Sequence, residues 1–294
     1  MAERNQRITF ARSPRGLPVP EDFGADEIAI PVPSEGQFLS RTIYLSLDPY
    51  YRNVMKNSQI YADRLNPGDV MVGETVAQIV ESRHPQFTVG EYVAVRNGWQ
   101  QYAVSSGQGV RKLDASSAPL GAALGVLGMP GLTGYAGTVY LGRPLPGQTF
   151  VVSACTGPVG TTAGQVARHM GARVVGIAGS AAKCEYAVNE LGFVACVNYK
   201  DGDLTAALKQ ACPDGIDVYF DNVGGDTLAA VTRNLALGAR IVLCGMIEAY
   251  SMDTPPPGPW LGPIVGARAT MSGLVVYDHM NRMPEMVKLI SAWI

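Results

Sequence analysis

The fold is decided by residues 150–160, which read FVVSACTGPVG. The apolar run Phe150 to Ala154 suits a buried strand and leads directly into a turn that contains Gly157 and Gly160. A helical pattern from Thr161 to Met170 follows, and a second apolar run begins at Arg173. Strand, glycine-containing turn, helix and strand in this order are typical of a βαβ unit in a parallel sheet.

The turn itself has the spacing A-x-x-G-x-x-G, with Ala154, Gly157 and Gly160 at the positions that need small residues. Absence of a Cβ lets a pyrophosphate approach the backbone, and the start of the following helix offers free N–H groups and the positive end of its dipole. A glycine motif alone is weak evidence. The flanking strands and helix make it a prediction of a dinucleotide site.

Working outward, the two sides of this turn differ in pattern. Downstream, apolar strands alternate with helical segments, with strands expected at 173–178, 194–198, 216–220, 240–244 and 270–277. Upstream, short alternating runs predict strands at 38–47, 72–81, 92–96 and 99–104. The predicted fold class is therefore α/β, with a mostly β domain over 1–125 and a doubly wound, Rossmann-type parallel-sheet domain over 126–294.

The charge balance argues for small-molecule partners. Apolar residues make up 47% of the chain and charged residues only 16%, which suits a compact enzyme rather than a disordered protein. Lys and Arg total 23 against 25 Asp and Glu, and no basic cluster would attract nucleic acid. We expect a small neutral substrate and no nucleic-acid partner.

Features of the chain that report on its location favour the cytoplasm. The five cysteines are scattered, as expected of reduced thiols, and the polar start Met1 to Arg7 leads into no secretory signal. The charge-free segment 115–142 is long enough to span a bilayer, but its seven glycines and two prolines would break a spanning helix. A buried connection is favoured, and no membrane partner is expected.

The end of the second strand predicts which dinucleotide binds. An enzyme that prefers NAD usually has an acidic residue here for the ribose hydroxyls, but no acid occurs before Glu185. Ser180 and Lys183 offer a hydroxyl and a cation instead, which favours NADP. The alternative is that Ser180 only caps the next helix and that Lys183 is a solvated surface charge.

Two further strand ends reach the same edge of the sheet. Asn222 follows one of them, where it could bind cofactor or simply form the turn. Cys244 ends the other, and we expect a small buried residue there rather than a nucleophile, because no His lies near it in sequence. Tyr250 follows shortly after, and its phenol could hydrogen-bond a substrate carbonyl.

Metal and nucleophile chemistry have little support. The chain has three histidines, His84, His169 and His279, and none pairs with a cysteine or carboxylate at a ligand spacing. The predicted β domain contains no cysteine, and no G-x-S-x-G motif is present. The remaining chemistry is hydride transfer with a proton from a side chain or solvent.

Six collinear segments resemble the zinc-free branch of the medium-chain dehydrogenases/reductases, within it the NADPH-dependent curcumin, 2-alkenal and prostaglandin reductases. Asn5-Gln6-Arg7 and Gly16 to Pro20 are most similar to the bacterial curcumin reductases. The segments are Leu45 to Tyr50, Gly128 to Tyr135, Ala154 to Gly160, Gly176 to Cys184, Asp221 to Gly225 and Cys244 to Ile247.

The resemblance implies a GroES-like β domain, a Rossmann domain, NADPH as cofactor and a homodimer. It also implies C-terminal strands that complete the β domain, and nothing up to Ile294 matches them. The implied substrate residues are Tyr50, Tyr61 and Tyr250, with Tyr250 as the proton-donating or carbonyl-binding residue. The implied cofactor residues are Met129, Thr133, Gly157, Val159, Gly160, Lys183, Tyr199, Asn222, Cys244, Gly245, Met246 and Ile247, and the end of the second strand adds Gly179 and Ser180 as predicted cofactor residues.

The expected activity is reduction of the α,β carbon–carbon double bond of an enone or enal, with hydride added to the β-carbon. Curcumin-like compounds, alkenals and oxidised lipids share this conjugated carbonyl group. Two alternatives remain open, which are an NADPH quinone reductase of the same superfamily and a protein that binds NADPH without catalysis.

Overall fold

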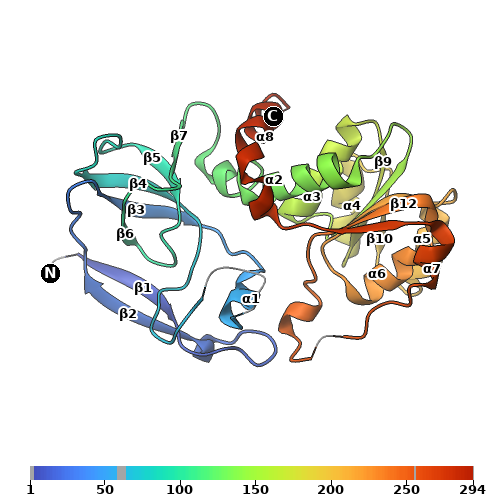
Figure 1. The fold of residues 1–294 in the computed structure, drawn as a ribbon, viewed down its shortest axis with the longest axis horizontal. Helices are drawn as coiled ribbons and strands as arrows, with labels where there is room; N and C mark the ends of the chain where they lie inside the picture. Colours follow the sequence, from blue (N-terminus) through green and yellow to red (C-terminus); the bar gives the residue numbers. More distant parts are fainter. Residues whose placement is uncertain (1–2, 58–63, 255, 294) are drawn as a thin grey trace. The chain divides into compact units, whose positions relative to one another are not determined.

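The computed structural model describes residues 3–57, 64–254 and 256–293, which form two compact units. The first unit extends to Leu124 and also includes Tyr250–Asp253. The second comprises Gly125–Ala249 and the chain from Thr254 onward. Figure 1 shows the antiparallel strands of the first unit and the helix-flanked sheet of the second.

The first unit is built on a five-stranded antiparallel sheet with the order β6-β3-β4-β5-β7. Side chains alternate across its strands, and Phe38, Ala77, Ile79 and Val93 fill a core on one side with almost no exposed surface. The strands are β3 (Phe38–Leu45), β4 (Thr75–Ser82), β5 (Tyr92–Val95), β6 (Tyr102–Ser105) and β7 (Arg111–Leu113).

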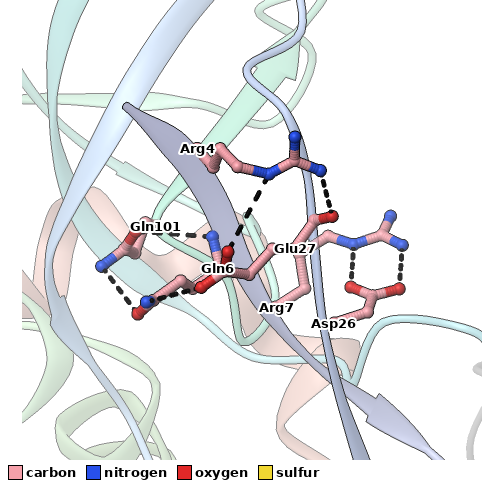
Figure 2. A network of polar contacts seen from close by, with 6 residues as sticks. All are labelled: Arg4, Gln6, Arg7, Asp26, Glu27 and Gln101. Atoms are coloured by element: carbon pink, nitrogen blue, oxygen red, sulfur yellow. Dashed lines mark hydrogen bonds and ion pairs between the residues drawn. The ribbon is translucent and has the colours of Figure 1, made fainter. Parts of the chain in front are cut away.

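A separate two-stranded antiparallel ribbon joins β1 (Arg4–Phe10) to β2 (Phe23–Ala29). On its exposed face, Nε and Nη2 of Arg7 donate to the two carboxylate oxygens of Asp26 at 2.8 and 2.6 Å (Figure 2). The amide of Gln101 donates to Oε1 of Gln6 at 3.3 Å and links the ribbon to the start of β6. The sequence patterns did not predict this ribbon, because polar residues occupy most of β1 and β2 shows no alternation of apolar and polar residues.

Short helical segments complete the first unit. The helix α1 (Tyr51–Met55) packs its buried residues Val54 and Met55 against Phe10 of β1. Two 3-10 turns, η1 (Pro20–Asp22) and η2 (Leu120–Leu124), also belong to this unit.

The second unit contains a six-stranded sheet with the order β10-β9-β8-β11-β12-β13, and every neighbouring pair is parallel. This order confirms the predicted doubly wound α/β fold. The strands are β8 (Thr149–Ser153), β9 (Arg173–Ala178), β10 (Ala195–Asn198), β11 (Ile216–Asp221), β12 (Leu235–Leu243) and β13 (Thr270–Gly273). The strand expected over 270–277 is shorter, because the 3-10 helix η5 (Val276–Arg282) follows β13.

Helices cover both faces of this sheet, which explains why its strands are apolar on both sides. Phe150, Val152 and Phe220 face a core that includes α3 (Pro158–His169) and α4 (Ala181–Asn189). Val151, Ile177 and Tyr219 face the other core. That second core includes α5 (Leu204–Ala211), α6 (Gly225–Thr232) and α7 (Gly262–Ala267), and the chain ends with α8 (Met283–Ser291).

The charge-free segment 115–142 forms three short elements rather than one long helix. After η2 come α2 (Met129–Ala136), whose residues from Pro130 onward are buried, and the π-helix η3 (Gly137–Gly142). Among the described residues, no helix combines the length and apolar content that crossing a bilayer requires. The expected buried connection therefore contains a helix, which its glycines and Pro130 concealed in the sequence.

Close packing of α2 on α3 depends on Gly134. A Cβ on this residue would lie 2.8 Å from the backbone nitrogen of Ala163 and 2.8 Å from the carbonyl oxygen of Val159. Both atoms belong to the backbone of α3, so neither can move aside without shifting the helix.

We predict that Gly134→Ala lowers the free energy of unfolding by about 1–3 kcal/mol, because it overpacks this contact. Thermal unfolding followed by circular dichroism should show a melting temperature lower by several degrees. Gly121→Ala is the matched control, since a Cβ there meets no atom within 4 Å. Equal melting temperatures for the two variants would contradict this reading of the α2–α3 contact.

Candidate functional site

The candidate site lies at the carboxyl edge of the parallel sheet. The chain leaves β8 toward β9 on one side, whereas β11 pairs with β8 on the other side, so the strand order reverses between β8 and β11. Ligands of open α/β sheets bind beyond the carboxyl ends of the strands at such a reversal. All predicted cofactor residues belong to the second unit, which contains this edge.

The turn after β8 is shaped for a phosphate group. Ala154 adopts the left-handed conformation with φ of 47°, and Gly157 is the N-cap of α3 without a side-chain cap. A Cβ on Gly160 would collide with the carbonyl oxygen of Ala154, so only glycine lets the helix start against the end of the strand. The N–H groups of Val159 and Gly160 lie in the first helical turn, where they have no intrahelical partner.

Charge distinguishes this helix start from its neighbour. The first turn of α3 contains no acidic residue, so its positive dipole end is available to an anion. At the start of α6, the carboxylate of Glu248 lies where a Cβ on Gly225 would be, and Asp226 adds a second acid. Of the two helices that flank the strand reversal, α3 therefore offers the better site for a pyrophosphate.

The predicted adenosine-phosphate residues come together at the ends of β9 and β10. Ser180 is the N-cap of α4, and its hydroxyl accepts the backbone N–H of Lys183 at 3.4 Å. Tyr199 follows β10, and its ring edge lies against Gly179, where a Cβ would be 3.0 Å from the phenol oxygen. The side chain of Lys183 is exposed to solvent. The structure thus brings the Ser180 hydroxyl and the Tyr199 phenol to the start of the helix that carries Lys183. No acidic residue occurs between Gly179 and Cys184.

Asp221 accepts several hydrogen bonds at the end of β11, next to the point where the strand order reverses. It is fully buried at the end of β11, and its Oδ1 accepts the phenol of Tyr219 at 2.8 Å and the N–H groups of Val223 and Gly224, each at 2.9 Å. Ser153 of β8 lies 3.3 Å from the same oxygen. Burial raises the pKa of Asp221, although these hydrogen bonds act in the opposite direction.

Asn222 is held firmly beside this carboxyl group. Its backbone N–H donates to Oγ of Ser153 at 2.9 Å, and its side-chain amide donates to the carbonyl oxygen of Ser153 at 2.8 Å. The Asn222 side chain thus ties β8 to the turn after β11. Turn formation, one of the two roles considered from sequence, is present, and cofactor binding stays a prediction.

The segment Cys244–Ile247 runs beside the turn after β11 and is hydrogen-bonded to its backbone. The N–H groups of Cys244 and Gly245 donate to the carbonyl oxygen of Asp221 at 2.9 and 3.0 Å. Ile247 donates to the carbonyl oxygen of Asn222 at 3.3 Å, and Met246 is 43% exposed. Desolvation and the nearby Asp221 raise the pKa of the Cys244 thiol to about 12, which disfavours the thiolate that a nucleophile requires.

The helix α2 carries the two residues that the resemblance assigns to the nicotinamide end. Thr133 donates its hydroxyl to the carbonyl oxygen of Met129 at 2.7 Å, so the two residues form one turn of the same helix. The neighbouring Gly134 touches the first turn of α3 at Val159. This contact brings α2 beside the predicted pyrophosphate turn.

Two of the predicted substrate tyrosines, Tyr50 and Tyr250, belong to the first unit. Tyr50 precedes α1, and its ring centroid lies 4.5 Å from that of Tyr51. Tyr250 begins the segment Tyr250–Asp253, which contacts α1, because Nη1 of Arg52 donates to Oγ of Ser251 at 3.2 Å. Tyr250 follows β12 in sequence, yet it clusters with the first unit. Tyr61 lies outside the described residues.

Polar residues that the sequence reasoning missed accompany Tyr50. The phenol oxygen of the buried Tyr51 accepts the backbone N–H of Glu74 at 3.2 Å. Burial raises the pKa of Glu74 and of Asp48, and the two carboxyl groups repel each other's charge. Asp48 belongs to the segment that carries the family resemblance, but its proximity to Glu74 depends on strand pairing and could not be deduced from sequence.

Comparison with known proteins decides the family. Residues 6–113 match the family described as the N-terminal domain of oxidoreductase, and residues 158–292 match that described as zinc-binding dehydrogenase. The chain is 43% identical to NADPH-dependent curcumin reductase of Escherichia coli, over 99% of this chain and 86% of the relative. The chain belongs to the medium-chain dehydrogenases/reductases. The resemblance identified from the motifs is thereby confirmed.

Other medium-chain dehydrogenases/reductases agree with this assignment. Prostaglandin reductase 1 of Rattus norvegicus is 39% identical over 91% of this chain and 80% of its own length. The crystal structure of CurA in complex with NADPH from Vibrio vulnificus has a TM-score of 0.93 at 40% identity, over 98% of this chain and 87% of that chain. Quinone oxidoreductase of Escherichia coli, at 20% identity and a TM-score of 0.79, shares the fold.

Metal ligands are not assembled in the part of the chain that the structure describes. There, no three His, Cys, Asp or Glu side chains lie close enough together to hold a metal ion. All five cysteines are free thiols, and Sγ of Cys155 lies 3.8 Å from Sγ of Cys196. A metal-independent reaction, which medium-chain dehydrogenases/reductases of the zinc-free branch perform, stays a prediction.

Proposed function

We propose that this medium-chain dehydrogenase/reductase uses NADPH to reduce the α,β carbon–carbon double bond of an enone or enal. The observation that carries the proposal is the carboxyl edge of the parallel sheet. An acid-free helix start lies at the end of β8, and a corner with Ser180, Lys183 and Tyr199 lies at the ends of β9 and β10. The names of relatives at 36–43% identity, which include curcumin, 2-alkenal and prostaglandin reductases, support the same activity.

The residues present fit NADPH in their charge and shape. Gly160 lets α3 start close to the end of β8, and the N–H groups of Val159 and Gly160 in this first helical turn suit a pyrophosphate. Ser180, Lys183 and Tyr199 would hold the 2′-phosphate of the adenosine ribose. When bound, NADPH supplies the hydride for the reduction. The remaining predicted cofactor residues, Met129, Thr133, Gly179, Asn222, Cys244, Gly245, Met246 and Ile247, would line its path along the sheet edge.

The substrate carbonyl is assigned to the tyrosines of the first unit. A phenol that donates a hydrogen bond to the carbonyl oxygen stabilises the enolate, whose negative charge develops when the β-carbon is reduced. We assign this role to Tyr250, with Tyr50 and Tyr61 as further substrate contacts. The first unit, with Met1–Leu124 and Tyr250–Asp253, would then be the substrate domain, and the second unit would be the NADPH domain.

We further propose that the enzyme is a cytoplasmic homodimer. Within the described residues, β13 pairs with β12 on one side and leaves its other edge without a strand partner. Apolar residues near this end of the sheet are exposed, with Leu237 at 73%, Trp260 at 82% and Val265 at 76%. A second copy that covers them would remove an edge and an apolar surface that monomers usually avoid.

The central test is steady-state oxidation of NADPH with a panel of acceptors. We expect turnover with linear enones and enals that exceeds turnover with a benzoquinone, and a product that retains its carbonyl group but lacks the double bond. Faster turnover of the benzoquinone would favour a quinone reductase. NADPH binding that raises nicotinamide fluorescence, without consumption across the panel, would indicate a protein that binds NADPH without catalysis.

Replacement of Lys183 tests the phosphate assignment. Loss of a charge-assisted hydrogen bond costs about 1.5–3 kcal/mol, so Lys183→Ala should weaken NADPH binding by roughly 10-fold to 100-fold and leave NADH binding unchanged. Fluorescence titration with the two cofactors measures this directly. An unchanged ratio of the two dissociation constants would refute the assignment.

Replacement of Tyr250 tests the proton-donating role. Tyr250→Phe removes only the hydroxyl and should lower kcat by about 100-fold, the scale of a general acid, while NADPH affinity stays within a factor of two. Tyr186→Phe is the control, because Tyr186 lies on α4 and is 48% exposed. Equal kcat values for the two variants would assign the proton to another donor.

A further inference from the structure

A second lysine lies at the adenosine corner, and neither the glycine motif nor the family resemblance singled it out. Lys200 follows Tyr199 directly after β10, and both side chains are exposed. The backbone N–H of Tyr199 donates to the carbonyl oxygen of Ala178 at 3.1 Å, and that of Lys200 donates to Oδ1 of Asn198 at 3.2 Å. The two residues are therefore fixed at the end of β9, beside Gly179.

The side chain of Lys200 folds back over the phenol ring of Tyr199. Its Nζ lies 5.8 Å from the ring centroid, within the range of a cation–π contact. The edge of the same ring lies against Gly179, next to the N-cap Ser180. Tyr199 thus connects Lys200 on one side with the start of α4, which carries Lys183, on the other.

The positive charges of both lysines are available to a ligand. Within the described ranges, neither Lys183 nor Lys200 forms an ion pair with a carboxylate. The nearest acids in sequence are Glu185 and Asp201, and both are exposed. An anion placed at Ser180 and Tyr199 would accordingly meet two cations from different elements of the sheet edge.

We propose that Lys200 is a second cofactor-specificity residue, which attracts the 2′-phosphate of NADPH across the ring of Tyr199. The inference rests on the proposed use of NADPH. Lys183 provides a direct contact, whereas Lys200 acts through its field and by holding the phenol in place. A single positive charge that acts on a dianion through solvent, without a direct contact, changes the affinity by about threefold to tenfold, and salt screens this attraction.

The experiment measures binding rather than turnover, so failure of the proposed reaction and failure of this inference give different results. The probes are NADPH and NADH, followed by fluorescence, and adenosine 2′,5′-bisphosphate and AMP as competitors. The proteins are the parent chain, Lys200→Ala, Lys200→Arg, Lys183→Ala, the double variant of Lys183→Ala with Lys200→Ala, and Lys209→Ala. Lys209 is the matched control, because it is a lysine at the far end of α5 whose Nζ donates to the carbonyl oxygen of Pro213 at 3.1 Å.

At low ionic strength, Lys200→Ala should weaken NADPH and adenosine 2′,5′-bisphosphate by about threefold to tenfold, with NADH and AMP unchanged. Lys200→Arg should restore the affinity, Lys209→Ala should have no effect, and about 0.5 M salt should remove most of the difference. Added to Lys183→Ala, the substitution should reduce the remaining preference for NADPH further.

Equal weakening of NADPH and NADH would show that Lys200 only supports the local structure and would overturn the inference. No change in either cofactor would overturn it as well. A preference for NADPH in the double variant equal to that in Lys183→Ala alone would show that Lys200 does not sense the phosphate. An absence of enone turnover, by contrast, would refute the proposed reaction and leave these binding results to be judged separately.

Discussion

The close approach of α3 to the end of β8 is the constraint on which the site depends. Gly160 leaves no room for a Cβ beneath the carbonyl oxygen of Ala154, and Ala154 itself adopts a left-handed conformation. Backbone N–H groups of the helix start are thereby held at the carboxyl edge of the sheet, where they can meet an anion without reorganisation. A larger residue at Gly160 would lift the helix away and disrupt the turn that we propose binds the pyrophosphate.

Hydrogen bonds at the end of β11 hold the neighbouring turn in place beside this one. Asp221 gathers the phenol of Tyr219 and two turn N–H groups, and Asn222 ties that turn to Ser153 of β8. Because these groups belong to β8, β11 and the turn after β11, and the two strands are neighbours in the sheet, the sheet itself fixes their spacing. Charge then selects between the helix starts, since Glu248 covers α6 while α3 stays free of acids.

Much of this could be predicted, because strand periodicity and the glycine spacing are local properties of the sequence. The parallel sheet, the turn from Ala154 to Gly160 and the corner with Ser180 and Lys183 follow from such patterns. The polar ribbon β1–β2 gave no apolar alternation, and α2 was concealed by glycine and proline. The contact of Asp221 with Ser153, the proximity of Asp48 to Glu74 and the position of Tyr199 against Gly179 depend on strand pairing, which single-sequence patterns do not encode.

The most direct measurement is a crystal structure of the chain with NADPH bound. The account predicts a pyrophosphate within hydrogen-bonding distance of the N–H groups of Val159 and Gly160, and a 2′-phosphate in contact with Ser180, Lys183 and Tyr199. A dinucleotide whose pyrophosphate lies at the start of another helix, or whose adenosine ribose points away from Lys183, would contradict it.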